Sequence, residues 1–271
     1  IDEELKIFSW AKKVYLDLKF IKGVRRTIAI GSGKGGVGKS SITVGIAQNL
    51  KKRGYKVGIL DADVYGPNIP VITGLNNQDV STKEEDGVTK FIAIDHDGLK
   101  IMSVAMLAKR EQSLAWRGPI LTRLLNQFLY QVDWGDLDFL LIDLPPGTGD
   151  TQITLLQDSP IIGVILVTLP GLSSYSDLIR TTTMYENFGM PIYGLVENMS
   201  FYKCPCCSHV EKLFLDEFPV KKMNSKNYNL LTSLPFFNSK LNAEGINLFL
   251  KEEISSYFDN VCSLIEEKAN F

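Results

Sequence analysis

A glycine-rich loop near the start of the chain has the residues needed to bind nucleotide phosphates. Residues 32–40 read SGKGGVGKS and fit the pattern G-x-x-x-x-G-K-[ST] in full. Glycines let the backbone turn its N–H groups toward phosphate oxygens, Lys39 would pair with the β- and γ-phosphates, and the Ser40 hydroxyl would ligate Mg²⁺. The predicted nucleotide contacts are Gly33, Lys34, Gly35, Gly36, Val37, Gly38, Lys39, Ser40 and Ser41. The pattern does not require Lys34, so that lysine needs a separate explanation.

Three aspartates follow apolar runs, as the acidic groups of a hydrolytic site do. Asp143 ends the run LDFLLID (137–143), the position of a Walker B aspartate that orders Mg²⁺ through water. Asp61 and Asp63 share one loop after another apolar run. A lone aspartate at such a place is often only a helix cap. Two aspartates in one loop instead favour a role at the γ-phosphate. The loop DLPPGTGD (143–150) follows Asp143 directly and is of a kind that changes conformation when the γ-phosphate leaves.

Three of the four cysteines lie within four positions, in the segment CPCC (204–207). A disulfide scaffold would distribute its cysteines along the chain, so this clustering indicates reduced thiols in a reducing compartment. Iron–sulfur clusters are held by thiolates, usually four, which two chains related by a two-fold axis could supply as a pair each. Zinc also takes Cys₄ from paired CxxC motifs, and His209 offers it a further ligand. Ligand identity alone leaves the two metals as equal alternatives.

The scaffold that must position these side chains is predicted from the apolar runs. Runs of near-continuous apolar character alternate with helical patterns, which is typical of a parallel sheet covered by helices on both faces. The sequence therefore predicts an α/β fold, with ligands beyond the carboxyl ends of the strands, where every polar motif above falls. Strands are predicted at 26–30, 55–60, 99–104, 137–143, 161–169 and 191–198, and helices at about 41–54, 113–132, 173–188 and 243–270.

Composition narrows the class of protein. The chain has 271 residues, of which 45% are hydrophobic and 22% charged, as in a globular protein with a real core. The net charge of −2 gives no global reason to expect nucleic acid as a partner. The longest apolar run (161–169) is too short to cross a bilayer, and the start, IDEELKIFSWAKK, lacks the pattern of a signal peptide. We therefore expect no nucleic-acid or membrane partner, and a cytoplasmic location or an organelle with a reducing interior.

Taken together, these segments resemble the deviant Walker A ATPases, the group that contains MinD, ParA and the nitrogenase iron protein. Within that group the sequence most resembles the Mrp/ApbC (Nbp-type) iron–sulfur cluster carrier ATPases. The resemblance rests on SGKGGVGKS (32–40), LDADVYGPNIP (60–70), WRGP (116–119), LIDLPPGTGD (141–150), VENMS (196–200) and the pair Cys204 and Cys207. It implies a three-layer P-loop NTPase fold with a mostly parallel sheet. We expect this domain over residues 24–271 and an N-terminal helical extension at 1–23.

The resemblance also implies roles for residues around the nucleotide. Lys34 matches the signature lysine that reaches across a dimer interface to the phosphates of the partner's nucleotide. Asp63 matches the residue that orients the attacking water, and Asp61 matches its neighbour near the metal. Asn198 matches the asparagine that reads the adenine, and Pro235 lies near a base-contacting loop. Lys34, Lys39 and Asp63 are therefore the expected catalytic residues.

The resemblance also implies an iron–sulfur cluster as the ligand of the cysteine pair. Cys204 and Cys207 match the pair that holds a bridging [4Fe–4S] cluster together with the same pair from a second subunit. The implied protein is a homodimeric ATPase that binds ATP and moves the cluster from an iron–sulfur scaffold to recipient apoproteins. Mg²⁺ would be held by Ser40, Asp61 and Asp143. The resemblance favours iron–sulfur, with zinc as the lesser alternative.

Some positions depart from the pattern of that family, among them the segment TLPG (168–171), where TTPQ is more usual. Cys206 lies between the paired cysteines where another residue is usual, and Gly45 replaces an asparagine common in the helix after the loop. A positioning ATPase of the MinD or ParA type, with a zinc-binding or vestigial CxxC, is the alternative interpretation. A MinD-like protein would need a basic amphipathic tail for anionic lipid, whereas the tail KEEISSYFDNVCSLIEEKAN (251–270) is acidic. That alternative also leaves the CPCC segment unexplained.

Overall fold

The computed structural model describes residues 20–85, 87–108, 118–214, 228–236 and 249–269. The strands of its main sheet are β1 (Val24–Ser32), β2 (Val57–Asp61), β5 (Ile94–His96), β6 (Leu99–Ser103), β8 (Leu137–Asp143), β9 (Ile161–Thr168), β10 (Ile192–Lys203), β11 (Val210–Lys212) and β12 (Leu230–Pro235). Their order is β11-β10-β9-β1-β8-β2-β6-β5, with β12 paired to β10. Every described pair is parallel except those of β5 and β11, which confirms the predicted, mostly parallel sheet.

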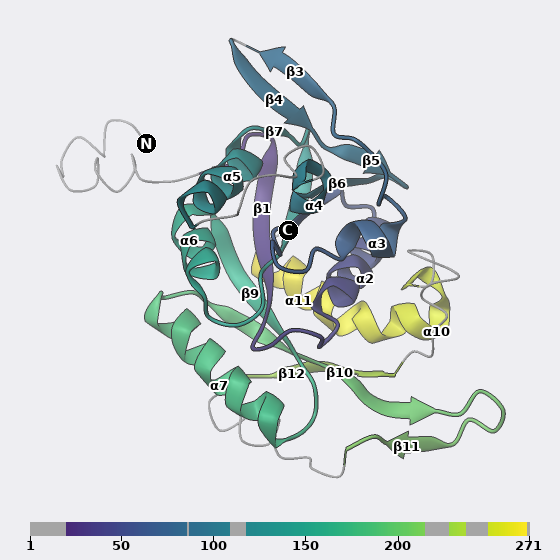
Figure 1. Cartoon of the computed structure of the whole chain (residues 1–271). Helices are drawn as coiled ribbons and strands as arrows, with labels where there is room; N and C mark the ends of the chain where they lie inside the picture. Colours follow the sequence, from purple (N-terminus) through teal and green to yellow (C-terminus); the bar gives the residue numbers. More distant parts are fainter. Residues whose placement is uncertain (1–19, 86, 109–117, 215–227, 237–248, 270–271) are drawn as a thin grey trace, which may run out of the picture.

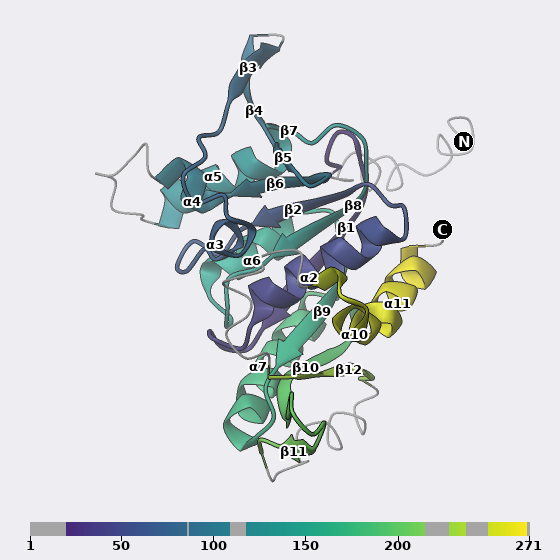
Figure 2. The same ribbon diagram turned by 90° about the vertical axis from the view of Figure 1, so that its right-hand side faces the viewer.

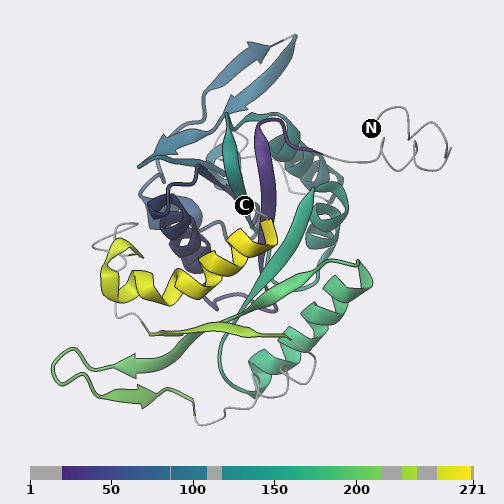
Figure 3. The same ribbon diagram turned by 180° about the vertical axis from the view of Figure 1, so that it is seen from behind.

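Helices cover both sides of this sheet. The helical segments are α2 (Lys39–Lys52), α3 (Ile69–Thr73), α4 (Val104–Ala108), α5 (Gly118–Tyr130), α6 (Asp150–Asp158), α7 (Leu172–Asn187), α10 (Glu252–Ser255), the 3₁₀ turn η3 (Ser256–Phe258) and α11 (Asp259–Ala269). Helices α5, α6 and α7 lie on one side, and α2, α10 and α11 lie on the other (Figures 1 and 3). The three-layer α/β architecture is therefore confirmed.

The central strands form where the sequence is continuously apolar. Strand β8 has the predicted bounds, and Phe139 to Ile142 within it are fully buried. Strand β9 is buried along almost its whole length as well. Because helices cover both faces of a parallel sheet, such strands have no polar face to present to water. Helix α6, which follows the loop after β8, was not among the predicted helices.

A second, smaller sheet lies beside the first and was not predicted. It consists of β3 (Thr82–Glu85), β4 (Val88–Ile92) and β7 (Val132–Asp133). Strands β3 and β4 form a hairpin that projects from the body of the molecule (Figures 1 and 2). Ion pairs support it, with Lys83 Nζ 2.5 Å from the Asp133 carboxylate and Lys90 Nζ 3.0 Å from Glu85. The polar segment at 76–87 thus contains a strand held by charged side chains.

The tail differs from the single helix predicted at 243–270. Lys251 has an extended backbone, α10 begins only at Glu252, and η3 separates α10 from α11. The Asn49 side chain of α2 donates a hydrogen bond to the Phe249 carbonyl oxygen at 3.3 Å, which fixes the chain just before the helix begins. The prediction of one continuous helix is therefore wrong over 249–269. Residues 243–248 lie outside the described part of the chain.

Some other expectations fall on residues that the structure does not describe. These are the N-terminal extension over 1–19, Trp116 and Arg117 of the WRGP segment, and the helix start at 113–117. Strand β1 begins at Val24, and the domain division at that residue stays a prediction. Among the described residues no helix combines the length and apolar character needed to span a membrane.

Gly45 lies where the tail packs on α2. A Cβ atom at this position would lie 2.3 Å from Phe258 Cζ and 3.0 Å from Phe249 Cδ1. The two rings pack edge to face with centroids 6.0 Å apart. The departure from the family's asparagine therefore has a packing reason, because the aromatic tail occupies the space of a side chain.

We expect Gly45→Ala to destabilise the fold by about 1–3 kcal/mol, because an extra methyl group overpacks a filled core. This strain acts against the gain in helix propensity of about 1 kcal/mol for alanine over glycine. Urea unfolding measures the change. Gly149→Ala is the matched control, because its φ of −79° is ordinary and no atom lies within 4 Å of the added Cβ. Unchanged stability of Gly45→Ala would contradict the packing argument.

Candidate functional site

The glycine-rich loop joins β1 to α2 at the carboxyl edge of the sheet. Gly36 and Gly38 have φ angles of 79° and 86°, a left-handed backbone that other residues rarely adopt. A Cβ on Gly38 would also lie 2.2 Å from Asn198 Nδ2. Asn198 itself donates a hydrogen bond to the Val37 carbonyl oxygen at 2.8 Å. The structure thus brings the predicted adenine-reading residue directly against the loop.

The other loop residues differ in their surroundings. A Cβ on Gly33 would lie 2.7 Å from the Asp177 carbonyl carbon, so the loop passes close to the backbone of α7. Gly35 is exposed, and Ser41 is half-buried in the first turn of α2. Lys34 is half-buried, and its side chain forms no ion pair with the part of the chain that the structure describes. Its ammonium group is therefore not committed to a carboxylate in that part of the chain.

Strand register brings the aspartates together. Asp61 of β2 pairs in register with Asp143 of β8, and Ser103 of β6 pairs with Asp61. Because parallel strands end at the same edge of a sheet, these polar residues meet where α2 begins. Asp63 follows two residues later and is buried beside them. The sequence prediction that the motifs share one edge is confirmed for these residues.

Asp143 is held on both carboxylate oxygens and is fully buried. Ser40 Oγ donates to its Oδ2 at 2.6 Å, and Thr43 Oγ1 donates to its Oδ1 at 2.8 Å. Lys39 Nζ lies 2.9 Å from the same Oδ2. The carboxylate therefore has a fixed orientation, and one of its oxygens is shared by the hydroxyl and the ammonium group of the loop.

Lys39 lies among three carboxylates. Its Nζ atom is 2.9 Å from Asp143 and 3.6 Å from Asp63, and it is attracted by the charge of Asp61. The carboxylate oxygens are close to Nζ, but none of these contacts within the described chain has the alignment of a hydrogen bond. A buried ammonium group with unused donors suits a phosphate oxygen. Three carboxylates around one lysine leave an excess of negative charge that suits a divalent cation.

Burial and the neighbouring charge of Asp143 raise the pKa of Asp61 to about 7. The Ser103 hydroxyl, which donates to Asp61 Oδ2 at 2.8 Å, and the charge of Lys39 act in the opposite direction. The backbone N–H groups of Asp63 and Ile69 also donate to this carboxyl group, at 3.2 Å and 3.3 Å. Asp61 therefore fixes the conformation of the loop that carries Asp63.

Asp63 has one oxygen for its loop and one that faces the lysine. Its Oδ1 accepts the backbone N–H groups of Tyr65 and Gly66, at 3.2 Å and 3.1 Å. Its Oδ2 is the atom nearest Lys39. A carboxylate held in this way has a defined direction toward Lys39. Its role in orienting water stays a prediction.

Sequence reasoning missed two residues of this site. Thr43 lies one helical turn after Lys39, on the same face of α2, so its reach to Asp143 follows from helix periodicity. Ser103 ends β6, and the rule that parallel strands end at one edge could have placed it beside Asp61. Neither residue belongs to a recognisable motif, so the sequence pattern did not predict either of them as part of the site.

The cysteines occupy the loop of a hairpin formed by β10 and β11. The hairpin projects from the body of the molecule (Figure 1). Cys204 is half-buried, whereas Cys206 and Cys207 are exposed, and no cysteine of the loop forms a disulfide. The Cys204 N–H donates to the His209 carbonyl oxygen at 2.8 Å, and the Ser208 N–H donates to the Cys204 carbonyl oxygen at 2.9 Å. The loop is therefore ordered by its own backbone and presents thiols to solvent.

The loop also stabilises a thiolate. Hydrogen bonds from the backbone of Cys207 and Cys206 lower the pKa of Cys204 below its usual range. A thiolate is the form that binds metals. Among the described residues no three His, Cys, Asp or Glu side chains are arranged to hold a metal ion. Cys262, by contrast, is fully buried in the core, and burial raises its pKa to about 12.

Pro235 lies at the end of β12, beside the strand that leads from the phosphate loop to the cysteine hairpin. It ends β12 and pairs in register with Phe201 of β10, three residues after Asn198. Its side chain is buried. This position is beside the strand that carries Asn198, which is compatible with a contact to the base. That contact stays a prediction.

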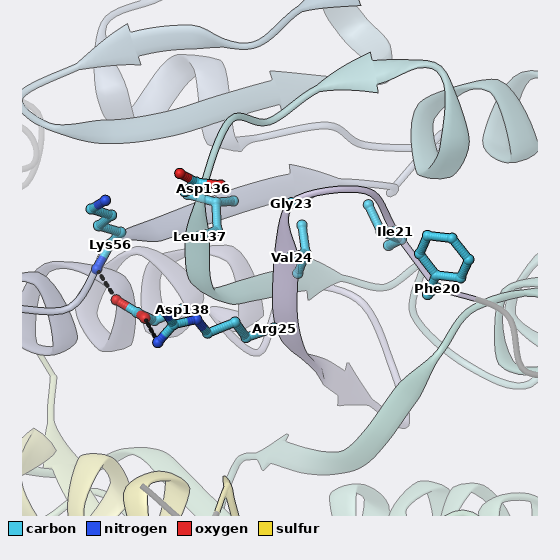
Figure 4. Close-up of a pocket in the computed structure, with 9 residues that line it drawn as sticks. All are labelled: Phe20, Ile21, Gly23, Val24, Arg25, Lys56, Asp136, Leu137 and Asp138. Atoms are coloured by element: carbon cyan, nitrogen blue, oxygen red, sulfur yellow. Dashed lines mark hydrogen bonds and ion pairs between the residues drawn. The ribbon is translucent and has the colours of Figure 1, made fainter. Parts of the chain in front are cut away.

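A hollow of about 480 Å³ lies at the opposite, amino edge of the sheet (Figure 4). Phe20, Arg25, Lys56 and Asp138 are among the residues that line it. The Asp138 carboxylate accepts hydrogen bonds from Arg25 Nη1 at 3.1 Å and from the Lys56 backbone N–H at 2.9 Å. The hollow therefore surrounds a structural ion pair at the strand starts and is separate from the site built by Lys39 and Asp143.

Comparison with known proteins agrees with this geometry. Residues 23–267 match the family model described as ParA: NUBPL iron-transfer P-loop NTPase. The chain is 40% identical over 218 residues to an iron–sulfur cluster carrier protein of Aquifex aeolicus, a match that covers 80% of this chain and 59% of that protein. It is 38% identical over 215 residues to the iron–sulfur cluster transfer protein NUBPL of Dictyostelium discoideum, covering 79% and 66%. The chain thus spans only part of the length of these relatives.

Solved structures give the same result for the fold. A nucleotide-binding protein from Archaeoglobus fulgidus, in complex with ADP, is 32% identical and has a TM-score of 0.74, with 92% of this chain and 95% of that chain covered. The septum site-determining protein MinD from Pyrococcus horikoshii, in complex with Mg-ADP, is 20% identical, with a TM-score of 0.63 and coverages of 90% and 97%. The MinD likeness shows the fold alone. The family match, the two relatives and the phosphate loop agree that this chain belongs to the family of ParA-type, NUBPL iron-transfer P-loop NTPases.

Proposed function

We propose that the chain binds and hydrolyses ATP and carries a [4Fe–4S] cluster at the interface of a homodimer. The cluster would arrive from an iron–sulfur scaffold and pass to recipient apoproteins. The observation that carries this proposal is the projecting hairpin with Cys204 and Cys207, on a chain with a complete phosphate-binding loop. Its thiols indicate a reducing compartment, the cytoplasm or an organelle with a reducing interior.

The nucleotide half of the proposal is supported by the unused groups of the loop. Backbone N–H groups at Gly33 to Gly38 and the start of α2 would hold the phosphates. Lys39 would exchange its carboxylate neighbours for phosphate oxygens, which offer its ammonium group the aligned acceptors it lacks. Asp63 Oδ2 would then accept a hydrogen bond from the attacking water, while Asn198 and Pro235 contact the base.

The residues fit Mg²⁺ as a cofactor. The Ser40 hydroxyl and the Asp143 carboxylate are hard oxygen donors, and Asp61 adds negative charge beside them. Bound Mg²⁺ would neutralise charge that develops on the transferred phosphate. Thr43 would keep Asp143 oriented after Ser40 turns toward the metal, because Thr43 uses the other carboxylate oxygen.

The cargo half of the proposal is supported by the number and placement of the thiols. A cluster takes usually four thiolates, and the pair Cys204 and Cys207 supplies two. Two copies related by a two-fold axis present the same patch to each other and would supply the other two. The same two-fold contact would bring Lys34 to the partner's phosphates. This role would explain why the Lys34 side chain forms no ion pair among the described residues.

The alternative of a MinD- or ParA-type positioning ATPase has no specific observation in its favour. MinD and the chain share the fold, but their sequences are only 20% identical. The relatives at about 40% identity are cluster carriers. Zinc at the cysteine pair stays the lesser alternative, and anaerobic reconstitution separates it from iron–sulfur.

We expect Lys34→Ala to reduce ATP hydrolysis far more than ATP binding. A cation supplied across an interface is worth about 10³-fold or more in kcat in related phosphoryl-transfer enzymes, so a loss of kcat of at least about 100-fold is expected. The Kd for ATP should rise by less than about tenfold, the equivalent of one modest contact. Steady-state turnover and calorimetric titration measure the two quantities.

Lys56→Ala is the control for this experiment, because Lys56 is an exposed lysine at the opposite edge of the sheet. It should leave both quantities as in the wild type. Equal losses of binding and turnover in Lys34→Ala would assign Lys34 to its own chain's phosphates and contradict the role across a dimer interface.

We expect anaerobic reconstitution with iron and sulfide to load about one cluster per two chains. The double variant Cys204→Ala/Cys207→Ala should bind none, whereas Cys206→Ala, the matched control in the same loop, should retain it. Absorption and electron paramagnetic resonance spectra identify the cluster, and mass determination under native conditions gives the number of chains. Uptake of zinc alone, or iron unchanged in the double variant, would refute the carrier function.

A further inference from the structure

One strand passes through both regions of the proposed function. Strand β10 carries Asn198 at its centre, against the Val37 carbonyl oxygen of the phosphate loop. It ends at Lys203, and Cys204 follows directly. A displacement of β10 near Asn198 therefore has a short covalent path to the cysteine loop.

The strand is interrupted by a bulge directly after Asn198. Between Glu197 and Phe201, β10 advances four residues, while its partner β12 advances only two, from Ser233 to Pro235. Two extra residues are thus accommodated in β10 alone. A bulge of this kind bends its strand and redirects the residues beyond it.

The bulge contains a backbone conformation that is disfavoured for its residue. Met199 has a φ of 53°, in the left-handed region that a residue with a branched or long side chain seldom adopts. Such a conformation persists only where the surrounding structure holds it, and it is found at switch regions. A Cβ atom added to Gly38 would lie 3.7 Å from Met199 Cε, so the Met199 side chain lies beside the phosphate loop.

Glu197 holds this bulge from its base. The Ser200 hydroxyl lies 2.8 Å from Glu197 Oε2 and 3.0 Å from the Glu197 carbonyl oxygen, so it joins Ser200 to Glu197 across the bulge. The Ser233 hydroxyl of β12 donates to the same Oε2 at 3.2 Å. One carboxylate therefore joins both sides of the bulge and the neighbouring strand.

Glu197 also marks the point at which β10 leaves the main sheet. Its pairing with Thr168 of β9 is the last in register between these two strands. Beyond it, the strand pairs with β11 and forms the projecting hairpin. The backbone N–H of Leu213, just after β11, donates to the Ser200 carbonyl oxygen at 3.4 Å, so the base of the hairpin rests on the bulge.

We propose that Glu197 is a positioning residue that holds the Asn198–Ser200 bulge, through which the nucleotide state of the phosphate loop sets the position of the cysteine hairpin. The proposal rests on the proposed function for its nucleotide. It adds to that function a physical route by which ATP and its product control the cargo site.

The route begins at two contacts with the loop. Asn198 is joined to the Val37 carbonyl by a hydrogen bond, and its amide lies so close to Gly38 that no side chain would fit between them. Phosphates that reorganise the loop, or a base that binds the Asn198 amide, must therefore move Asn198. Because Met199 is held in a disfavoured conformation, a small movement there is enough to change the bend of β10.

The test uses the full chain, reduced and free of iron, so that it does not depend on cluster loading. Alkylation of Cys204, Cys206 and Cys207 by iodoacetamide is followed by peptide mass spectrometry, with and without saturating Mg-ADP or a slowly hydrolysed ATP analogue. Nucleotide affinity is measured in parallel by calorimetry. In the wild type we expect a nucleotide-dependent change in alkylation rate of at least about fivefold, the lower range of ordinary coupling between two sites.

Glu197→Ala should abolish this nucleotide dependence while the chain still binds nucleotide, because the loop that holds the phosphates is intact. Glu197→Gln keeps an acceptor oxygen for the two serines and should retain the dependence. Ser233→Ala removes one support from the other strand and should weaken it, which provides a second variant if Glu197→Ala does not fold. Glu211→Ala, an exposed carboxylate of the same hairpin, is the matched control and should behave as the wild type.

The outcomes separate this inference from the function on which it rests. Nucleotide binding without any change of thiol reactivity in the wild type would overturn the inference alone. A nucleotide dependence that survives in both Glu197→Ala and Ser233→Ala would overturn it as well. Failure of the wild type to bind nucleotide would overturn the proposed function and, with it, the inference.

Discussion

The buried charge around Lys39 is the constraint on which the rest of the structure depends. Ionised groups are costly to bury unless opposite charges and hydrogen bonds compensate them. Here one ammonium group faces Asp61, Asp63 and Asp143, so compensation is incomplete and the site retains negative charge. Burial, and after it the neighbouring charge of Asp143, raises the pKa of Asp61, as expected for a carboxyl group whose charge is incompletely compensated. A bound cation and phosphate would complete the arrangement, and in the proposed function a nucleotide would therefore strongly influence the loops that carry these side chains.

Sheet architecture determines how far that influence can extend. The carboxylates lie on β2 and β8 in the centre of the sheet, where helices on both faces restrict movement. The cysteines lie beyond β10 toward the edge, on a hairpin that projects from the body (Figure 1). A buried centre would suit the proposed phosphate chemistry, whereas an edge exposed to solvent would suit the proposed transfer of a cluster. Strand β10 is the one element of the described chain that touches the phosphate loop and also ends at the cysteines.

Comparison of expectation with structure shows which patterns carry information. The strand at 137–143 was predicted with its observed bounds, because a strand buried on both faces reads as an uninterrupted apolar run. The hairpin of β3 and β4 was missed, because lysine–carboxylate pairs hold it and its sequence has no apolar alternation. The tail is helical in part, with Phe249 and Phe258 buried, but it is not the single continuous helix that was predicted. The side chain of Asn49, 200 residues earlier in the sequence, donates a hydrogen bond to the Phe249 carbonyl oxygen and holds the chain just before α10 begins.

The sequence by itself determined the chemical groups of this protein: the phosphate loop with its two lysines, the paired aspartates, and the compact cysteine segment. It could do so because each depends on residues close together in the chain, in patterns set by local backbone geometry. Only the tertiary structure decided which distant side chains support them. Thr43 and Ser103 reach the aspartates, Phe258 fills the space above Gly45, and Glu197 joins two serines around a bulge. These contacts follow from strand order, register and packing between segments far apart in sequence, and no local pattern records them.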